Sequence, residues 1–198
     1  VEAAAKRQLS GLEFIYKMPG SVGGSLWMNA RCYGISIGEV PGTVRFLDET
    51  LSRQVLDLPD PRFAYKKSPF QNSGAILLYA DFHLQPGDEQ EIRRRMEEVE
   101  ADRRRKGHFE YPCAGSVFKN NRSFGKPSGQ ILDELGLRGF AQGGAQVAPF
   151  HANIIINTGN ATAADVRSLI LHAQREAYEK RSIVLEPEIK LVGDWSEA

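Results

Sequence analysis

Residues 153–177 read NIIINTGNATAADVRSLILHAQREA, and this stretch decides the fold of the C-terminal half. An apolar strand, Asn153 to Asn157, is followed by a turn and by a helix that begins at a capping box of Thr162 and Asp165. One face of this helix is apolar: Val166, Leu169, Ile170, Ala173 and Ala177. Together with a further strand near the chain's end, this pattern predicts an α+β domain.

Upstream, residues 11–85 alternate glycine-rich turns with short apolar runs, a pattern typical of strands joined by tight turns. From Asp88 to Lys106 the composition shifts to a highly charged helix. Its narrow apolar stripe consists of Ile92, Met96 and Val99. A shorter helix is predicted from Ser128, as the N-cap, to Leu135.

These patterns predict three parts of the chain. We expect a mostly β domain at residues 1–87, a linker helix at 88–108 and the α+β domain at 109–198. The sequence shows no internal repeat and no low-complexity segment.

The composition argues against several classes of protein. The 198-residue chain has 25 basic and 25 acidic residues, and its zero net charge disfavours nucleic acid and anionic membranes as partners. Arginine runs in the charged helix are interleaved with glutamates, which favours a solvated face. Cys32 and Cys113 form no CxxC pair, which argues against a disulfide scaffold and a zinc site, so we expect no metal.

We also expect a cytoplasmic protein with small-molecule partners. No apolar run reaches the roughly 18 residues that a membrane span needs, and the first residues lack the apolar stretch of a signal peptide. The chain begins without methionine, inside what reads as a helix from Ala3 to Leu9, so we expect an amputated N-terminus. The sequence does not indicate an oligomeric state.

A glycine-rich loop precedes Met28, Asn29 and Ala30. Glycines without a Cβ let main-chain amides approach a planar or anionic ligand, but the same pattern also suits a tight turn with positive φ. The residues of the loop are Pro19, Gly20, Ser21, Val22, Gly23 and Gly24.

A second motif, residues 114–120, brings a hydroxyl, a cation and an amide into a short span through Ser116, Lys119 and Asn120. Such a cluster suits an anionic substrate, although a serine in a turn often satisfies only nearby backbone. No histidine and carboxylate stand in a triad pattern with Ser116, so a hydrolase is disfavoured.

A third motif is predicted to be an edge strand over Leu185 to Leu191, with Pro187 at the edge. Glu186 and Glu188 then lie on one face about 7 Å apart, from a rise of about 3.3 Å per residue. Two such carboxylates raise each other's pKa if water is excluded, and otherwise form a wet strand face. Read together, the three motifs predict one active site.

In this combination the chain resembles the UDP-N-acetylenolpyruvoylglucosamine reductase (MurB) family. The resemblance runs in order over nearly the whole chain. The segments that carry it are residues 11–30, 63–68, 111–120, 143–147, 151–166 and 185–193.

The resemblance implies a flavoenzyme of peptidoglycan precursor synthesis. In the family, NADPH reduces FAD, and the enolpyruvyl group of UDP-N-acetylglucosamine enolpyruvate is then reduced to give UDP-N-acetylmuramate. The fold implied is α+β: the second half of a two-part FAD-binding domain of the vanillyl-alcohol-oxidase (PCMH) type, then a smaller α+β substrate-binding domain. The short connection before Tyr111 is similar to the shorter family subtype.

The resemblance also implies roles for individual residues. Ser116 is the expected proton donor, and Lys66 takes the position of an active-site arginine. Glu188 is the expected second active-site carboxylate, and its neighbour Glu186 is less favoured for that role. Substrate contacts are implied for Tyr65, Lys119, Asn120, Gln146 and His151. Flavin contacts are implied for the loop from Pro19 to Gly24 and for Asn29.

The chain departs from the family pattern in three places. The family reads phenylalanine, glycine, tyrosine, arginine where this chain has Phe63, Ala64, Tyr65 and Lys66, and lysine lacks the planar fork that binds a carboxylate with two hydrogen bonds. Small residues of the family are replaced by Arg31 and Cys32. Nothing in residues 1–10 supplies the further glycine-rich flavin loop of the family.

Two other hypotheses follow from these departures. One is a catalytically silent nucleotide-sugar binding module, because Lys66 and the missing loop both weaken flavin chemistry. The other is a different flavoprotein oxidase with the same type of FAD domain, which requires the terminal motif at residues 185–188 to be coincidental.

Overall fold

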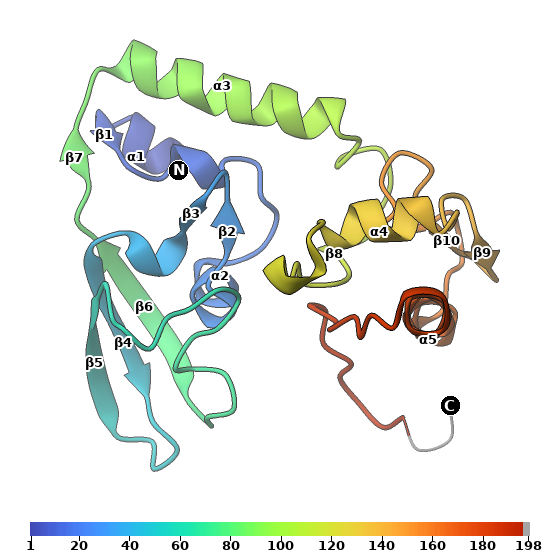
Figure 1. Cartoon of the computed structure of the whole chain (residues 1–198). Coiled ribbons are helices and arrows are strands. Elements are labelled where there is room, and N and C mark those ends of the chain that lie inside the picture. The colour runs from blue at the N-terminus through green and yellow to red at the C-terminus, as the bar shows by residue number, and fades with distance from the viewer. Residues whose placement is uncertain (196–198) are drawn as a thin grey trace. The chain divides into compact units, whose positions relative to one another are not determined.

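The computed structural model describes residues 1–195 and divides the α+β chain into two compact units, residues 1–102 and residues 103–198. Figure 1 labels most of the helices and strands of both units, and each unit is described by itself. No helix within residues 1–195 is both long and apolar enough to span a membrane. The same residues contain no cluster of histidine, cysteine or carboxylate side chains that could hold a metal ion.

The first unit is built on a three-stranded antiparallel sheet in the order β5-β4-β6, whose strands lie side by side in Figure 1. The bounds are Gly42–Leu47 for β4, Arg53–Leu58 for β5 and Ile76–Phe82 for β6. Helix α2 (Val22–Met28) contacts β6. The core between them consists of Phe14, Leu26, Ala30, Ile37, Val40, Val44, Leu56, Leu58 and Phe70.

Short elements complete this unit. Strands β2 (Arg31–Cys32) and β3 (Ile35–Ser36) form a hairpin, and β1 (Leu9–Ser10) pairs with β7 (Gln85–Pro86). The remaining elements are α1 (Glu2–Ala5) and the 3-10 helices η1 (Glu13–Ile15) and η2 (Ile37–Glu39).

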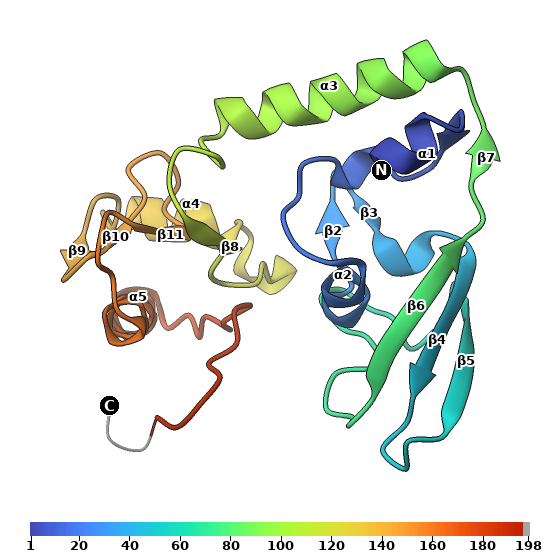
Figure 2. The same ribbon diagram turned by 180° about the vertical axis from the view of Figure 1, so that it is seen from behind.

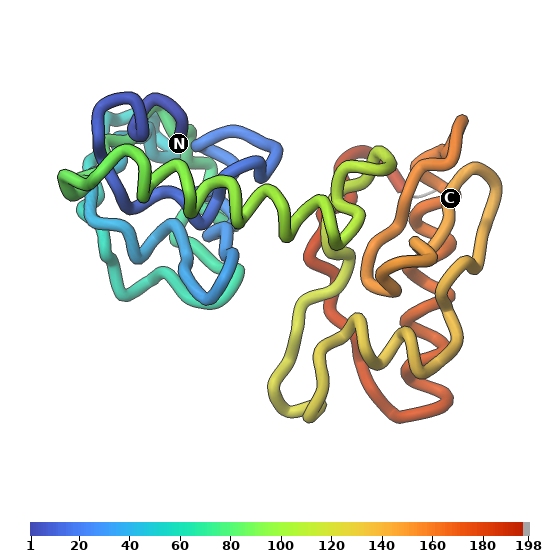
Figure 3. Tube along the Cα trace, turned by 90° about the horizontal axis from the view of Figure 1, so that it is seen from above, coloured from blue at the N-terminus to red at the C-terminus, as the bar shows by residue number. Residues whose placement is uncertain are grey.

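The predicted charged helix is confirmed as α3, Glu89–Arg105, which is continuous along the tube in Figure 3. Its stripe is not exposed: Ile92 and Met96 are buried against Ala5 of α1, with Val1 and Tyr16 packed on the same cluster. The arginines pair with glutamates three or four residues away, for example Arg94 with Glu91 at 2.7 Å. The charges therefore form the solvated face that the sequence favours.

The second unit is a four-stranded antiparallel sheet in the order β8-β11-β10-β9, whose strands are labelled in Figure 2. It is accompanied by α5 (Ala163–Arg181), α4 (Ser128–Glu134) and the 3-10 helix η3 (Arg122–Phe124). The strands are β8 (Cys113–Ser116), β9 (Ala141–Gln142), β10 (Ala145–Val147) and β11 (Ile154–Asn157).

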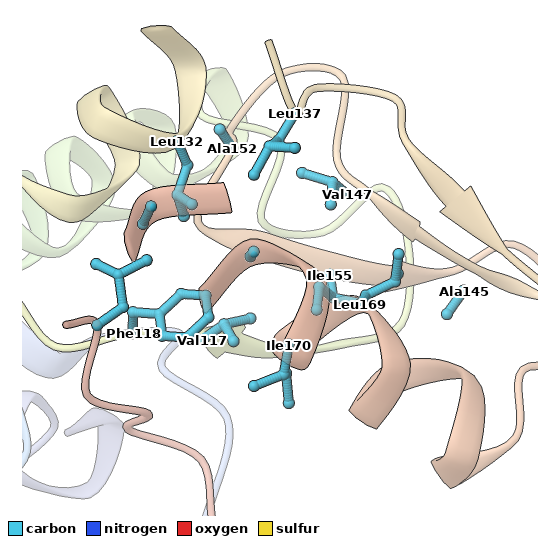
Figure 4. Close-up of a cluster of buried hydrophobic side chains, with 13 residues drawn as sticks. Val117, Phe118, Leu132, Leu137, Ala145, Val147, Ala152, Ile155, Leu169 and Ile170 are labelled. Atoms are coloured by element: carbon cyan, nitrogen blue, oxygen red, sulfur yellow. The ribbon is translucent and has the colours of Figure 1, made fainter. Parts of the chain in front are cut away.

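Strand β11 is buried on both faces. Ile155 packs in the cluster of Figure 4, where it lies near Leu169 and Ile170 of α5, whereas Ile154 and Ile156 belong to a second cluster with Ala148. Because successive side chains of a strand point to opposite faces, three isoleucines in a row serve both clusters. Each fully buried isoleucine contributes about 1.5–3 kcal/mol.

The capping box at the start of α5 is confirmed, since the Thr162 side chain accepts from the Asp165 N–H and Asp165 accepts from the Thr162 N–H. The predicted cap of α4 is wrong. Pro127 occupies the N-cap, and Ser128 is the first helical residue, fully buried, with its hydroxyl donating to the Lys119 carbonyl at 2.6 Å. Ser128 therefore ties α4 to the second motif instead of capping its own helix.

The predicted strand over residues 185–191 is also wrong. Only Pro187 forms a bridge, with Phe118, and the residues around it belong to no strand. The bonds of this bridge come from its neighbours, because Glu188 N–H donates to the Val117 carbonyl at 2.7 Å and Lys119 N–H donates to the Glu186 carbonyl at 2.9 Å. Pro187 is tolerated here because the bridge needs no N–H from it.

The capping box generates a stability prediction. Thr162→Ala removes the acceptor of the Asp165 N–H, so we expect the free energy of unfolding to fall by about 1 kcal/mol, as for other lost N-caps. Urea unfolding followed by circular dichroism measures this change. Thr162→Ser retains the hydroxyl and is the matched control; an equal loss in both variants would contradict the capping role.

Candidate functional site

In the first unit, the glycine-rich loop leads directly into helix α2. Ser21 is the N-cap, and its hydroxyl accepts from the Gly24 N–H at 3.0 Å. Gly23 and Gly24 are therefore helical, and only Gly20 needs positive φ, at 134°. A Cβ on Gly20 would meet no atom within 4 Å, and the Val22 side chain is 56% exposed. The loop thus offers open backbone and an exposed apolar side chain.

Asn29, predicted to contact flavin, is buried at the left-handed C-cap of α2. Its amide nitrogen donates to the Ala64 carbonyl at 2.7 Å, and its amide oxygen accepts from the Gly38 N–H at 3.1 Å. Both ends of this side chain bond to the protein's own backbone. Asn29 therefore fixes the segment that carries Tyr65 and Lys66 to the end of α2.

Tyr65 and Lys66 lie at the tip of a tight turn. Two hydrogen bonds between Ala64 and Lys67, of 3.1 and 3.0 Å, close the turn, and Lys66 has φ of 56°. The turn is anchored to α2 a second time by Gln71, whose amide donates to the carbonyls of Trp27 at 2.9 Å and of Lys66 at 3.2 Å. The backbone under the Lys66 side chain is thus held in one place.

In the second unit, Ser116 ends β8 and lines a cavity of about 300 Å³. Polar side chains form much of its wall. Those that bear on its chemistry are Ser116, Asn120, Asp133, Arg138, His151 and Asn153. The structure therefore brings together three residues that the sequence predicts for the site, Ser116, Asn120 and His151.

His151 lines this cavity, where burial favours the neutral form of its side chain. Burial lowers the pKa of its imidazole below the usual 6.5, with the nearby cations Arg138 and Lys106 acting in the same direction. Its Nδ1 accepts from the Asn153 N–H at 3.2 Å, which assigns the remaining proton of the neutral ring to Nε2. Gly129 permits this placement, because a Cβ there would lie 3.0 Å from the ring.

Lys119 does not line the cavity. Its ammonium pairs with the Glu186 carboxylate at 2.6 Å, with the lysine side chain 11% exposed and the glutamate side chain 68% exposed. Asn120 accepts from the Ser128 N–H at 2.9 Å. The two neighbouring polar residues thus have different surroundings.

Glu186 and Glu188 of the third motif also have different bonding partners. Glu186 faces Lys119, while the main chain of Glu188 is bonded to Val117, the residue that follows Ser116. Gln146 lies apart from the cavity lining, because its amide donates to the Gly139 carbonyl at 3.0 Å. The substrate contact expected of Gln146 therefore has no support from the cavity.

Sequence reasoning missed two residues here. Arg138 lies beside Asp133 in the cavity wall, and its sequence neighbourhood carries no motif. Asn153 is 4% exposed and bonds to both the N–H and the C=O of Phe118. Asn153 lies within one of the segments that carry the family resemblance, but the sequence indicates no role for it. A polar residue beside an apolar run has no periodic signal that reveals its distant bonding partner.

Comparisons with known proteins agree with the segments found in the sequence. Residues 107–192 match a family model described as UDP-N-acetylenolpyruvoylglucosamine reductase, C-terminal domain. Proteins named UDP-N-acetylenolpyruvoylglucosamine reductase from Borrelia garinii subsp. bavariensis and Treponema denticola are 42% and 43% identical, and the matches cover 96% and 97% of this chain. This chain spans only 62% and 63% of their length.

A solved structure is also similar to this chain. The crystal structure of UDP-N-acetylenolpyruvylglucosamine reductase (MurB) from Thermus caldophilus matches with a TM-score of 0.79 at 31% identity. The match covers 96% of this chain and 66% of that chain.

The buried imidazole generates a pH prediction. Because the pKa of His151 is lower in the folded than in the unfolded state, the unfolded state binds more protons as pH falls through 6.5, and stability falls with it. We expect urea midpoints measured at about pH 7.5 and about pH 5.5 to differ less in His151→Gln than in the natural sequence.

A second variant controls for the loss of a histidine as such. His83→Gln changes an exposed position in the first unit and is expected to retain the natural pH dependence of the second unit. The burial argument is refuted if His151→Gln keeps the full difference between the two urea midpoints.

Proposed function

Because this chain belongs to the UDP-N-acetylenolpyruvoylglucosamine reductase (MurB) family, we propose that its full-length natural protein is an oxidoreductase of peptidoglycan precursor synthesis. The proposed reaction reduces UDP-N-acetylglucosamine enolpyruvate to UDP-N-acetylmuramate with NADPH and FAD. The observation that carries the proposal is the polar cavity that Ser116 lines together with Asn120 and His151. We further propose that residues 1–87 belong to the FAD-binding part, 88–108 to a linker helix and 109–198 to the substrate-binding part.

The residues of the first unit are compatible with FAD. A flat ligand with a diphosphate needs backbone that it can approach, and the loop at Gly20 is exposed with no atom where a Cβ would stand. Residues 19–24 are proposed to hold the cofactor, and Asn29 is proposed to act by fixing the end of α2. When bound, FAD supplies hydride transfer from NADPH to the substrate.

The second unit is proposed to supply the proton. Reduction of the enolpyruvyl double bond adds a hydride to one carbon and a proton to the other. The carbon that receives the proton first gains negative charge beside a carboxylate, so a proton donor must lie next to it. The Ser116 hydroxyl is proposed to give its proton to this carbon, whose electron pair forms the new C–H bond, and to recover a proton from solvent.

Other residues are proposed to manage the charge of the substrate. Glu188 is proposed as the second carboxyl group of the active site. Lys119 and Asn120 are proposed for the diphosphate or the carboxylate. His151, which lines the cavity, is proposed as a further substrate contact. Lys66 and Tyr65 are proposed for the same substrate, with Lys66 offering a point charge.

One observation favours a second candidate function. Lysine at position 66 lacks the guanidinium fork of the arginine expected from the resemblance. The alternative proposal is therefore a nucleotide-sugar binding module without catalysis. The two functions differ in their need for flavin.

The proposed function is tested on the full-length natural protein supplied with FAD. We expect retained flavin absorption after gel filtration and NADPH consumption that depends on the enolpyruvyl substrate. Calorimetry that detects the nucleotide sugar but no FAD would instead support the binding module. If the protein binds both FAD and the nucleotide sugar but consumes no NADPH, the proposed reductase activity is refuted.

The role of Ser116 is tested separately. Ser116→Ala removes the proton donor, so we expect flavin reduction by NADPH to persist while product formation falls roughly 10²-fold or more. Stopped-flow absorbance follows the first step and product analysis the second. Ser123→Ala, at an exposed serine of η3, is the matched control. Equal product formation by Ser116→Ala and the natural sequence would remove Ser116 from the mechanism.

A further inference from the structure

We propose that Asn153, a residue with no assigned role, is the positioning residue of the Ser116 site. The proposal rests on the function proposed above for Ser116. It concerns how the backbone after Ser116 is held, and it assigns Asn153 no contact with the substrate.

The backbone changes partner directly after Ser116. Ser116 is paired with Ile154 across β8 and β11, and the Val117 N–H continues this pairing by donating to the Asn153 carbonyl at 2.9 Å. The Val117 carbonyl, however, accepts from Glu188 on the opposite edge. The N–H and C=O groups of Phe118 therefore point toward Asn153, which precedes the first residue of β11.

Asn153 meets these groups with its side chain. The amide oxygen accepts from the Phe118 N–H and the amide nitrogen donates to the Phe118 carbonyl, each at 2.8 Å. The side chain thus supplies one acceptor and one donor, as the backbone of a neighbouring strand residue would. Phe118 is 2% exposed, so water cannot replace these bonds without opening the core.

With Asn153 in place, the whole segment after Ser116 is bonded. All six main-chain N–H and C=O groups of residues 117–119 have partners, from Asn153, Glu186, Glu188 and Ser128. Asn153 is the member of this set that also bonds to His151, through its own N–H. One buried residue therefore bonds both to the backbone after the proton donor and, through its own N–H, to the His151 imidazole that lines the cavity.

Other asparagines cannot take this place. Asn157, at the far end of β11, is exposed, and its side chain accepts from Gly159 and Ala161 within its own turn. Asn157→Ala is therefore a matched control, because it also removes hydrogen bonds between an asparagine side chain and backbone, at the opposite end of β11, but leaves residues 116–119 alone.

The first test concerns the backbone alone and needs no cofactor. Asn153→Ala removes both side-chain bonds to Phe118, so we expect amide hydrogen exchange at Phe118 to become about tenfold faster or more. Exchange in α5 should stay unchanged. Unaltered exchange at Phe118 in a folded Asn153→Ala protein would overturn the proposal.

The second test concerns catalysis in the full-length protein. We expect Asn153→Ala to lower product formation roughly 10²-fold, as for a displacement of about 1 Å in a reacting group, with flavin reduction by NADPH unchanged. In the Ser116→Ala background the same substitution should cause no further loss. Losses that multiply in the double variant would show that Asn153 acts independently of Ser116 and would overturn the proposal.

Asn153→Asp gives a readout that packing alone would not move. An ionised aspartate has no donor for the Phe118 carbonyl, whereas a protonated carboxyl offers one donor and one acceptor, as the amide does. We expect product formation relative to the natural protein to recover as pH is lowered, a recovery absent in Asn153→Ala. If the alanine variant does not fold, this pH profile decides: a flat profile overturns the proposal.

The outcomes also separate this inference from the proposed function. If Ser116→Ala forms product at the natural rate, the proposed mechanism fails whatever Asn153 does. If Ser116→Ala is impaired while Asn153→Ala is not, only the positioning role fails.

Discussion

The second unit depends on the hydrogen bonding of three consecutive peptide groups, residues 117–119. These residues are the point at which β8, the start of α4 and the terminal segment 186–188 meet, and no one regular sheet could satisfy them all. An unsatisfied buried peptide group costs about 1–3 kcal/mol, so a chain that brings these segments together must provide each partner. The partners come from the main chain of Glu186 and Glu188 on one edge and from the carbonyl and side chain of Asn153 and the Ser128 hydroxyl on the other.

The first unit solves a similar problem in the same way. Asn29 is 3% exposed and Asn153 is 4% exposed, and each uses both ends of its amide on backbone groups of a distant segment. In each unit the buried amide lies beside a segment that carries residues proposed for the site, Tyr65 and Lys66 in the first and Ser116 in the second. A hydrophobic residue could fill the same volume but could not fix a loop that belongs to no sheet, because only directional bonds specify its place.

The sequence predicts those parts of the fold that repeat along the chain. Helices α3 and α5, strand β11 and the capping box are predictable because periodicity and local capping need no knowledge of distant residues. Ser128 is mispredicted because its hydroxyl has a partner in Lys119, nine residues earlier, and such competition is invisible locally. The strand expected at residues 185–191 reduces to one bridge between Phe118 and Pro187, and the alternating pattern of these residues does not reveal that the pairing ends after two hydrogen bonds.

The turn at position 66 does not depend on the side chain that it presents. The Tyr65–Lys66 turn is closed by the bonds between Ala64 and Lys67, and it is anchored by the amides of Asn29 and Gln71. None of these bonds uses the side chain at position 66, since Gln71 reaches only the Lys66 carbonyl. Exchange of arginine for lysine therefore changes the group that the turn presents, from a planar fork to a point charge, while the bonds that place it stay the same.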